Sequence, residues 1–124
     1  MSELVQIIEP PSLKAKMQAA SERRKAPRAV PLGSAFVLIN NKRYRIGDWS
    51  RLGLKFGPVA DEFEVGMALP IDVTVDDYRV QRIQFSGFLT VLRVLNGEAA
   101  GRYVCREGSD TTKIDHYFRV VVGV

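Results

Sequence analysis

The chain has 124 residues, of which 46% are hydrophobic and 26% are charged, and its net charge at pH 7 is +4. This is the usual size of one domain, with enough apolar residues to bury a proper core. The single cysteine excludes an internal disulfide, and no apolar run approaches the length of a membrane-spanning helix, about 18 residues. Because the N-terminus also lacks the pattern of a signal peptide, we expect a cytoplasmic protein.

The first part of the chain carries few structural signals before a basic stretch. Ser12 is a suitable N-cap for a short helix over residues 13–23. Pro27 lacks an N–H group and disfavours helix before it, so the chain is expected to become extended there. We therefore divide the sequence into an N-terminal extension, residues 1–20, and a folded domain, residues 21–124.

The pattern then changes to strands joined by tight turns. Residues 35–39 form a β-rich run, and the Asn-Asn pair at 40–41 suits a hairpin turn. Residues 43–48 return with alternating apolar side chains, and residues 54–56 predict a short third strand. Residues 57–66 form an acidic loop with two glycines and one proline.

The second half begins with the clearest strand signal, the alternating apolar side chains of residues 69–75. Residues 79–95 predict one long strand whose apolar parity slips between Val80 and Ile83 and again near Gly87. Such slips beside a glycine predict bulges or a bend, as a small barrel requires.

The last part of the chain predicts a hairpin followed by a closing helix. Asn-Gly at 96–97 is a strong hairpin signal, and residues 101–107 form the last expected strand. Ser109 or Asp110 is expected to cap the helix. Its apolar face is Ile114, Tyr117, Phe118 and Val121. We interpret the apolar end, residues 120–124, as the last turn of this helix; the alternative is a chain cut just before a membrane segment. Regular short strands predict an all-β barrel or sandwich.

Two motifs separated by 19 residues carry the chemistry. The first is RxxxR at Arg24 and Arg28, and the second is DxSxxG at Asp48, Ser50 and Gly53. Arginine can donate two hydrogen bonds to O6 and N7 of guanine, whereas the N1–H and N2–H₂ edge needs an acceptor such as a carboxylate. Phosphates prefer arginine and exposed backbone N–H groups. The set suits an anionic guanine nucleotide.

The charge distribution agrees with an anionic ligand. Residues 22–55 contain nine Lys or Arg and two acidic residues, a net charge of +7, whereas the rest of the chain carries −3. Basic charge gathered around the motifs predicts an anionic partner. The alternative is an ordinary solvated basic surface.

The pair RxxxR and DxSxxG resembles the signature of PilZ domains, bacterial receptors for cyclic di-GMP, over roughly residues 20–120. The resemblance implies a six-stranded antiparallel β-barrel with a C-terminal α-helix and a basic N-terminal arm. It also implies that Arg24 and Arg28 hold guanine and phosphate. Asp48 and Ser50 would contact the guanine edge or a phosphate, and Gly53 would allow a close turn.

Two residues beside the motifs modify what the resemblance implies. Trp49 stands where the family usually has a smaller apolar residue, which affects the packing under the turn. Arg23 directly precedes RxxxR, and an arginine there is associated in the family with cyclic di-GMP bound as an intercalated dimer. We therefore include Arg23 among the ligand-binding residues and expect two ligands per chain.

These features predict a receptor and adaptor rather than an enzyme, with no cofactor, no metal site and no nucleic acid as partner. Cyclic di-GMP would order an arm that like charges keep loose, and the arm would regulate an effector protein in motility, exopolysaccharide or biofilm output. Two alternatives stay open. One is a PilZ-like docking module that binds no nucleotide. The other is a small nucleic-acid-binding barrel, suggested by Tyr44 between Arg43 and Arg45.

Other reactive side chains are assigned ordinary roles. His116 and Cys105 cannot form a metal cluster together, so we expect a surface or helix-packing histidine and a buried structural thiol. The acidic residues at 61–64 and 76–77 lack calcium-ligand spacing, so turn chemistry and solvation explain them. Asp48 could also be a turn cap bonded to its own backbone.

Overall fold

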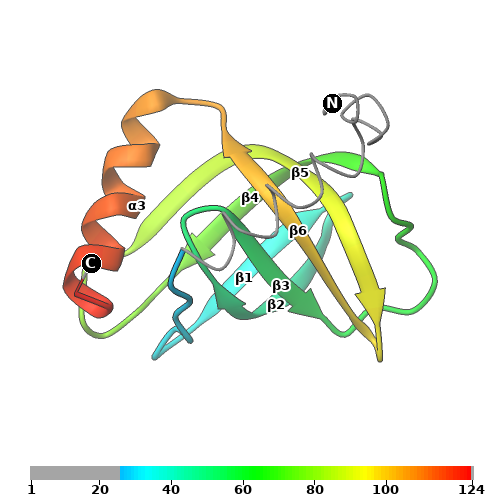
Figure 1. Cartoon of the computed structure of the whole chain (residues 1–124), viewed down its shortest axis with the longest axis horizontal. Helices are drawn as coiled ribbons and strands as arrows, with labels where there is room; N and C mark the ends of the chain where they lie inside the picture. Colours follow the sequence, from blue (N-terminus) through cyan, green and yellow to red (C-terminus); the bar gives the residue numbers. More distant parts are fainter. Residues whose placement is uncertain (1–25, 124) are drawn as a thin grey trace, which may run out of the picture.

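Six antiparallel strands close into a barrel and one helix follows them in the computed structural model, which describes residues 26–123 (Figure 1). The order around the barrel is β1-β2-β3-β6-β5-β4. The elements are β1 (Ala35–Ile39), β2 (Lys42–Trp49), β3 (Gly53–Gly57), β4 (Ala68–Val75), β5 (Ile83–Leu95), β6 (Glu98–Cys105) and α3 (Gly108–Val121). The predicted six-stranded barrel with a C-terminal helix is confirmed. The predicted helix over 13–23 and the boundary after residue 20 lie outside the described residues.

Two hairpin turns form where the sequence predicts them. Asn40 and Asn41 have φ of 53° and 64°, and Asn96 and Gly97 have φ of 55° and 78°. Two successive residues with positive φ form the turn whose twist matches that of paired strands, and Asn and Gly tolerate this conformation best. These turns set the registers of β1 with β2 and of β5 with β6.

Trp49 lies at the centre of the core where α3 meets the barrel. Its side chain is fully buried, and its ring centroid is 4.9 Å from that of Tyr117 and 4.8 Å from that of Phe118. The predicted apolar face of α3 is thus confirmed, with Val121 only partly buried. The indole N–H has no hydrogen-bond partner within residues 26–123, although it lies close enough to the Tyr117 hydroxyl to affect the pKa of that group.

Asp77 links the helix α3 to the segment before β1 and the segment after β4, which also pair with each other through the backbone, Tyr78 N–H donating to the Leu32 carbonyl at 3.0 Å. Its carboxylate accepts hydrogen bonds from the backbone N–H of Leu32 at 3.1 Å and from the hydroxyl of Tyr117 at 2.7 Å. The guanidinium of Arg79 donates two more, at 2.8 and 2.7 Å. The predicted turn chemistry is confirmed, since the Arg79 N–H donates to Asp77 Oδ1 at 3.0 Å, whereas the predicted solvation is wrong because the side chain is buried.

Two strand boundaries differ from the predictions. The strand expected over 79–95 begins only at Ile83, and the strand expected over 101–107 begins at Glu98 and ends at Cys105. A bulge or a bend was expected at Gly87, but pairing with β4 runs unbroken through this residue and pairing with β6 begins at it, so no bulge lies there. The irregularity in the pairing of β5 with β6 lies between Val91 and Arg93. Gly87 instead allows close strand approach, since a Cβ atom there would lie 2.1 Å from a backbone oxygen of β6.

The predicted helix cap is also wrong. Glu107 occupies the N-cap position of α3 and makes no side-chain capping bond, so neither Ser109 nor Asp110 caps the helix. Packing of the apolar face supplies the stability that a cap would otherwise add, as in most protein helices. Within the described residues, the structure contains no helix that is long and apolar enough to span a bilayer.

The Asp77 network predicts a pH-dependent loss of stability. Hydrogen bonds from Arg79, and then from Tyr117, hold the pKa of Asp77 well below its usual value. In an unfolded chain the pKa of an aspartate is about 4. The carboxylate therefore stabilises the fold fully above about pH 4, and this contribution to stability is lost as the pH falls through the lower pKa of the folded state. Asp77→Asn should lower the free energy of unfolding at pH 7 by about 1–3 kcal/mol, measured by urea titration.

The difference between the parent protein and Asp77→Asn should shrink at pH 3. Asp61→Asn is a matched control, because this aspartate lies in an exposed loop. Equal losses in both variants, or a difference that does not change with pH, would contradict the assigned role of Asp77.

Candidate functional site

The two motifs meet at Arg28 and Asp48. Arg28 Nε donates to Asp48 Oδ1 at 2.5 Å, although the residues are 20 positions apart. A short β-bridge positions the arginine: Ala29 N–H donates to the Trp49 carbonyl at 2.8 Å, and Trp49 N–H donates to the Ala29 carbonyl at 3.0 Å. The expectation of an arm that is loose as far as Arg28 is therefore wrong, because backbone and side-chain bonds already fix this residue to β2.

A bulge at Gly47 turns Asp48 towards the arm. The register of β2 with β3 shifts between Ile46 and Asp48, so one extra residue separates the buried side chains of Ile46 and Trp49. Without it, strand alternation would place Asp48 in the core and Trp49 outside. The bulge thus buries the tryptophan and leaves the neighbouring carboxylate half-exposed at the surface.

Ser50 and Gly53 shape the turn after β2. Ser50 is fully buried, and its Oγ accepts hydrogen bonds from the N–H groups of Leu52 at 3.1 Å and Gly53 at 3.2 Å. The Tyr103 hydroxyl donates to the Ser50 carbonyl at 2.6 Å; burial raises the pKa of Tyr103, which keeps this donor protonated. A Cβ at Gly53 would lie 2.6 Å from the carbonyl oxygen of Gly101, so only glycine lets β3 and β6 approach here.

Two charged residues that the sequence reasoning missed extend the site. Lys55 Nζ lies 3.5 Å from Asp48 Oδ2 and 3.8 Å from Glu98 Oε1. Lys55 stands between the buried Leu54 and Phe56, so strand alternation alone would have placed it on the outer face. Asp48 therefore lies between two cations, which keeps its carboxylate in place as an acceptor.

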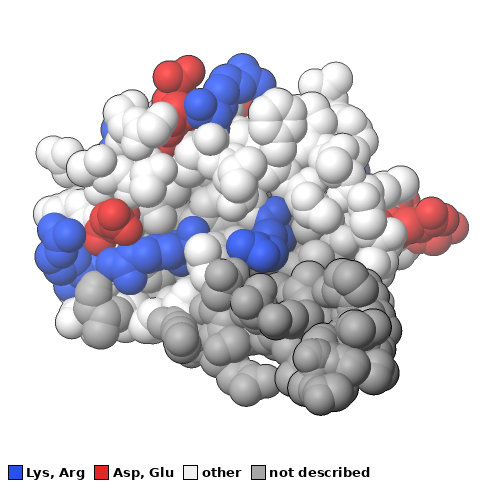
Figure 2. All heavy atoms as spheres, turned by 45° about the horizontal axis from the view of Figure 1, so that its top comes forward, with Lys and Arg blue, Asp and Glu red and all other residues white. Residues whose placement is uncertain are grey.

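Three other cations of the basic segment bind elsewhere. Arg51 Nε donates to Asp115 Oδ1 of α3 at 2.8 Å, Lys42 lies 3.5 Å from Glu62, and the Arg43 guanidinium lies over the Phe36 ring. Figure 2 shows one face of the molecule, on which Lys and Arg side chains form a band with few acidic groups beside it. Arg23 and Arg24 lie outside the described residues.

A groove of about 540 Å³ is lined by Val30 and Gly47, which lie close in sequence to Arg28 and Asp48, although neither member of that pair lines it. Gly47 and Gly57, which bring bare backbone to its surface, also line it, together with Arg45 and Glu98. This volume lies within the range of small-molecule sites. A flat ligand in this groove would meet one guanidinium, that of Arg45, and one carboxylate, that of Glu98.

The other reactive residues have the following places. His116 is exposed on α3, in agreement with the predicted surface or helix-packing role. Cys105 was expected to be a buried thiol, but it is only partly buried. Glu62 accepts a hydrogen bond from the Ala60 N–H at 2.7 Å, which confirms the predicted turn chemistry. It also accepts one from the Tyr44 hydroxyl at 2.9 Å, so solvation alone does not explain this acid. Burial and then Glu62 raise the pKa of Tyr44 to about 12.

The sequence matches no protein-family model and no curated protein. Several solved structures resemble the barrel. One is the Bacillus subtilis inhibitor of motility (MotI/DgrA), with a TM-score of 0.61 and 18% identity over 77% of this chain and 48% of that chain. The present chain thus spans about half the length of that protein.

Two further structures match with lower scores. The PilZ domain of CeSA from a cellulose-synthesizing bacterium has a TM-score of 0.50 and 12% identity, covering 78% of this chain and 96% of that chain. The uncharacterised Legionella protein Lpg0364 has a TM-score of 0.51 and 12% identity, and the match covers 75% of this chain and 90% of that chain. Together with the closed six-stranded barrel and its C-terminal helix, these similarities show that the chain has a PilZ-type fold.

Proposed function

We propose that this chain is a cytoplasmic receptor for cyclic di-GMP that acts as an adaptor on a partner protein, without catalysing a reaction and without a cofactor. The observation that carries the proposal is the contact between Arg28 and Asp48, which joins one residue of each motif at 2.5 Å. A guanidinium and a carboxylate side by side complement the acceptor and donor edges of guanine. Arg23, Arg24, Ser50 and Gly53 complete the proposed set of ligand-binding residues.

The regulated process is part of the same proposal. One structural neighbour is named an inhibitor of motility, and another is a PilZ domain from a cellulose-synthesizing bacterium. These names support motility, exopolysaccharide or biofilm formation as the output. We propose that ligand binding changes the conformation of the N-terminal arm and thereby its surface for the effector protein.

The docking-module alternative has one observation in its favour. The hydroxyl of Ser50 already caps the turn, so the DxSxxG segment is complete without a nucleotide. The nucleic-acid alternative has less support, because Tyr44 is buried in the core and its ring is therefore not available for base stacking. Isothermal titration with cyclic di-GMP separates receptor from docking module, since only the receptor binds.

Arg28→Ala should weaken binding of cyclic di-GMP by about 1.5–3 kcal/mol, the range for hydrogen bonds to charged groups. The measurement is titration calorimetry at fixed salt concentration. Arg43→Ala is the matched control, because Arg43 belongs to the same basic segment but lies over Phe36, outside the site. Equal losses in the two variants would indicate a diffuse charge effect and contradict the site assignment.

The change in the arm predicts a change in proteolysis. Trypsin cleavage after Arg24 and Lys25 should slow when cyclic di-GMP is saturating. Mass spectrometry of the fragments over time measures the rate of cleavage at each bond. The bond after Arg28 is an internal reference, because the Ala29–Trp49 bridge already holds it. Unchanged cleavage after Arg24 and Lys25, with binding verified by calorimetry, would refute ordering of the arm.

The arginine that precedes the first motif predicts the stoichiometry. Two stacked cyclic di-GMP molecules bring about four phosphate charges together, and an extra guanidinium offsets their repulsion or stacks on guanine. The parent protein should bind two ligands per chain and Arg23→Leu only one, while binding itself survives. Calorimetry that gives one ligand per chain for the parent protein would reject the dimer.

A further inference from the structure

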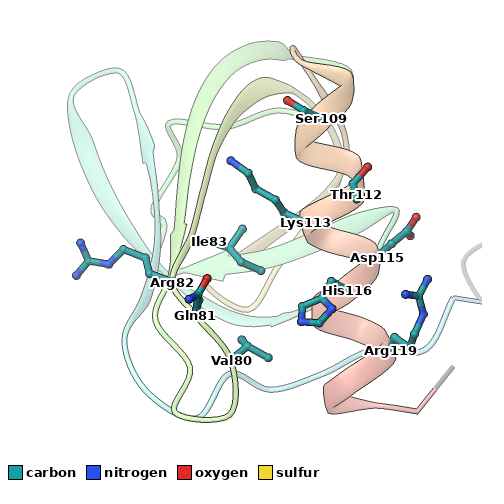
Figure 3. Close-up of a pocket in the computed structure, with 10 residues that line it drawn as sticks. All are labelled: Val80, Gln81, Arg82, Ile83, Ser109, Thr112, Lys113, Asp115, His116 and Arg119. Carbon is teal, nitrogen blue, oxygen red and sulfur yellow. The ribbon is translucent and has the colours of Figure 1, made fainter.

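A second groove lies between α3 and the segment that leads into β5, and it shares no residue with the proposed nucleotide site. Its volume is about 570 Å³, within the range of binding sites. Residues 80–83 form one wall and residues 109–119 of α3 form the other (Figure 3).

The two walls differ in chemistry. On the helix wall, Lys113 and His116 point towards the opposite segment, whereas Asp115 and Arg119 point away from it (Figure 3). Asp115 binds Arg51. On the other wall, Val80 and Ile83 present apolar side chains and Gln81 an amide, whereas Arg82 points away and binds Asp76. One side of the groove is therefore cationic and polar, and the other is largely apolar.

Several polar groups in the groove are available to a ligand. Among residues 26–123, the Gln81 amide and the His116 imidazole have no hydrogen-bond or ion-pair partner. Lys113 makes one ion pair, 3.3 Å from Asp110, and its side chain is 57% exposed. The positive charge on this wall is thus only partly compensated, which favours an occupant with carboxylates.

The shape and lining disfavour a nucleotide. No Phe, Tyr or Trp lines the groove among the described residues, so a base has no stacking surface apart from the imidazole of His116. No glycine lines it, so it lacks the bare backbone N–H groups that cradle phosphate. Its donors are spread over about two turns of helix rather than converging on one point.

An extended peptide matches both walls at once. Successive side chains of an extended chain point to opposite sides, so a segment that alternates acidic and apolar residues turns its carboxylates to one wall and its apolar side chains to the other. We propose that this groove binds an extended segment of a partner protein in which acidic and apolar residues alternate. The segment forms an ion pair with Lys113 and packs on Val80 and Ile83.

The test uses the full chain and a synthetic peptide with blocked ends, Glu-Val-Glu-Leu-Glu. In an NMR titration, this peptide should shift the amide signals of residues 80–83 and 109–119. The uncharged peptide Gln-Val-Gln-Leu-Gln should leave these signals unchanged. Lys113→Gln should weaken binding about two- to fivefold, and the charge reversal Lys113→Glu should weaken it further. Val80→Thr, which keeps the side-chain shape, should also weaken binding.

Lys42→Gln is the matched control. Lys42 is also exposed, at 64%, and also makes one ion pair, 3.5 Å from Glu62, but it lies outside the groove. Equal weakening by Lys42→Gln, equal binding of the glutamine peptide, or shifts centred on Arg28 and Lys55 would overturn the proposal. Inorganic phosphate that produces the same shifts and displaces the peptide would overturn it too, because the groove would then be a small-anion site.

The outcome is independent of nucleotide binding. The groove variants should bind cyclic di-GMP as the parent protein does, because none of them touches Arg28 or Asp48. If the chain binds the peptide but no cyclic di-GMP, the proposed nucleotide receptor is refuted and the proposed peptide groove stands. If the chain binds cyclic di-GMP but not the peptide, the proposed peptide groove is refuted and the proposed receptor stands.

Discussion

The buried carboxylate of Asp77 accepts hydrogen bonds from Leu32, Arg79 and Tyr117, and so joins the segment before β1, the segment after β4 and the helix α3. A buried charge is tolerated only when donors surround it, so this arrangement leaves little freedom to any of the three. Leu32 lies four residues after Arg28, and Tyr117 directly follows His116. The position of the proposed nucleotide site and the shape of the second groove therefore depend on the same carboxylate.

The two proposed sites also share a direct connection through Arg51. This residue belongs to the DxSxxG turn, yet its guanidinium binds Asp115, which lines the groove on α3. Any occupant that moves the turn acts on the helix through this ion pair. Thermodynamic linkage requires the effect to be reciprocal: a ligand that strengthens peptide binding is itself bound more tightly when the peptide is present.

Periodicity and turn chemistry predicted most of the barrel, because alternating apolar side chains and Asn-rich turns are local signals. What they could not predict depends on contacts between distant segments. Gly87 looked like a bulge because its need for close strand approach appears only once β6 lies beside it. Asp77 looked solvated because its three donors come from three separate segments. The closeness of Arg28 to Asp48 was expected only from the family resemblance, and Lys55 was missed although alternation placed it outward.

The position of Trp49 gives the protein a built-in optical reporter. It is the only tryptophan in the chain, and it stands between Asp48 and Ser50 while its ring packs on Tyr117 and Phe118. All tryptophan emission therefore originates from this one ring beneath the DxSxxG turn, where the side chain is fully buried. An indole in such surroundings emits at short wavelength, and its intensity responds to small displacements of nearby rings. Movements of the turn and separation of α3 from the barrel are both readable in the unlabelled protein by fluorescence.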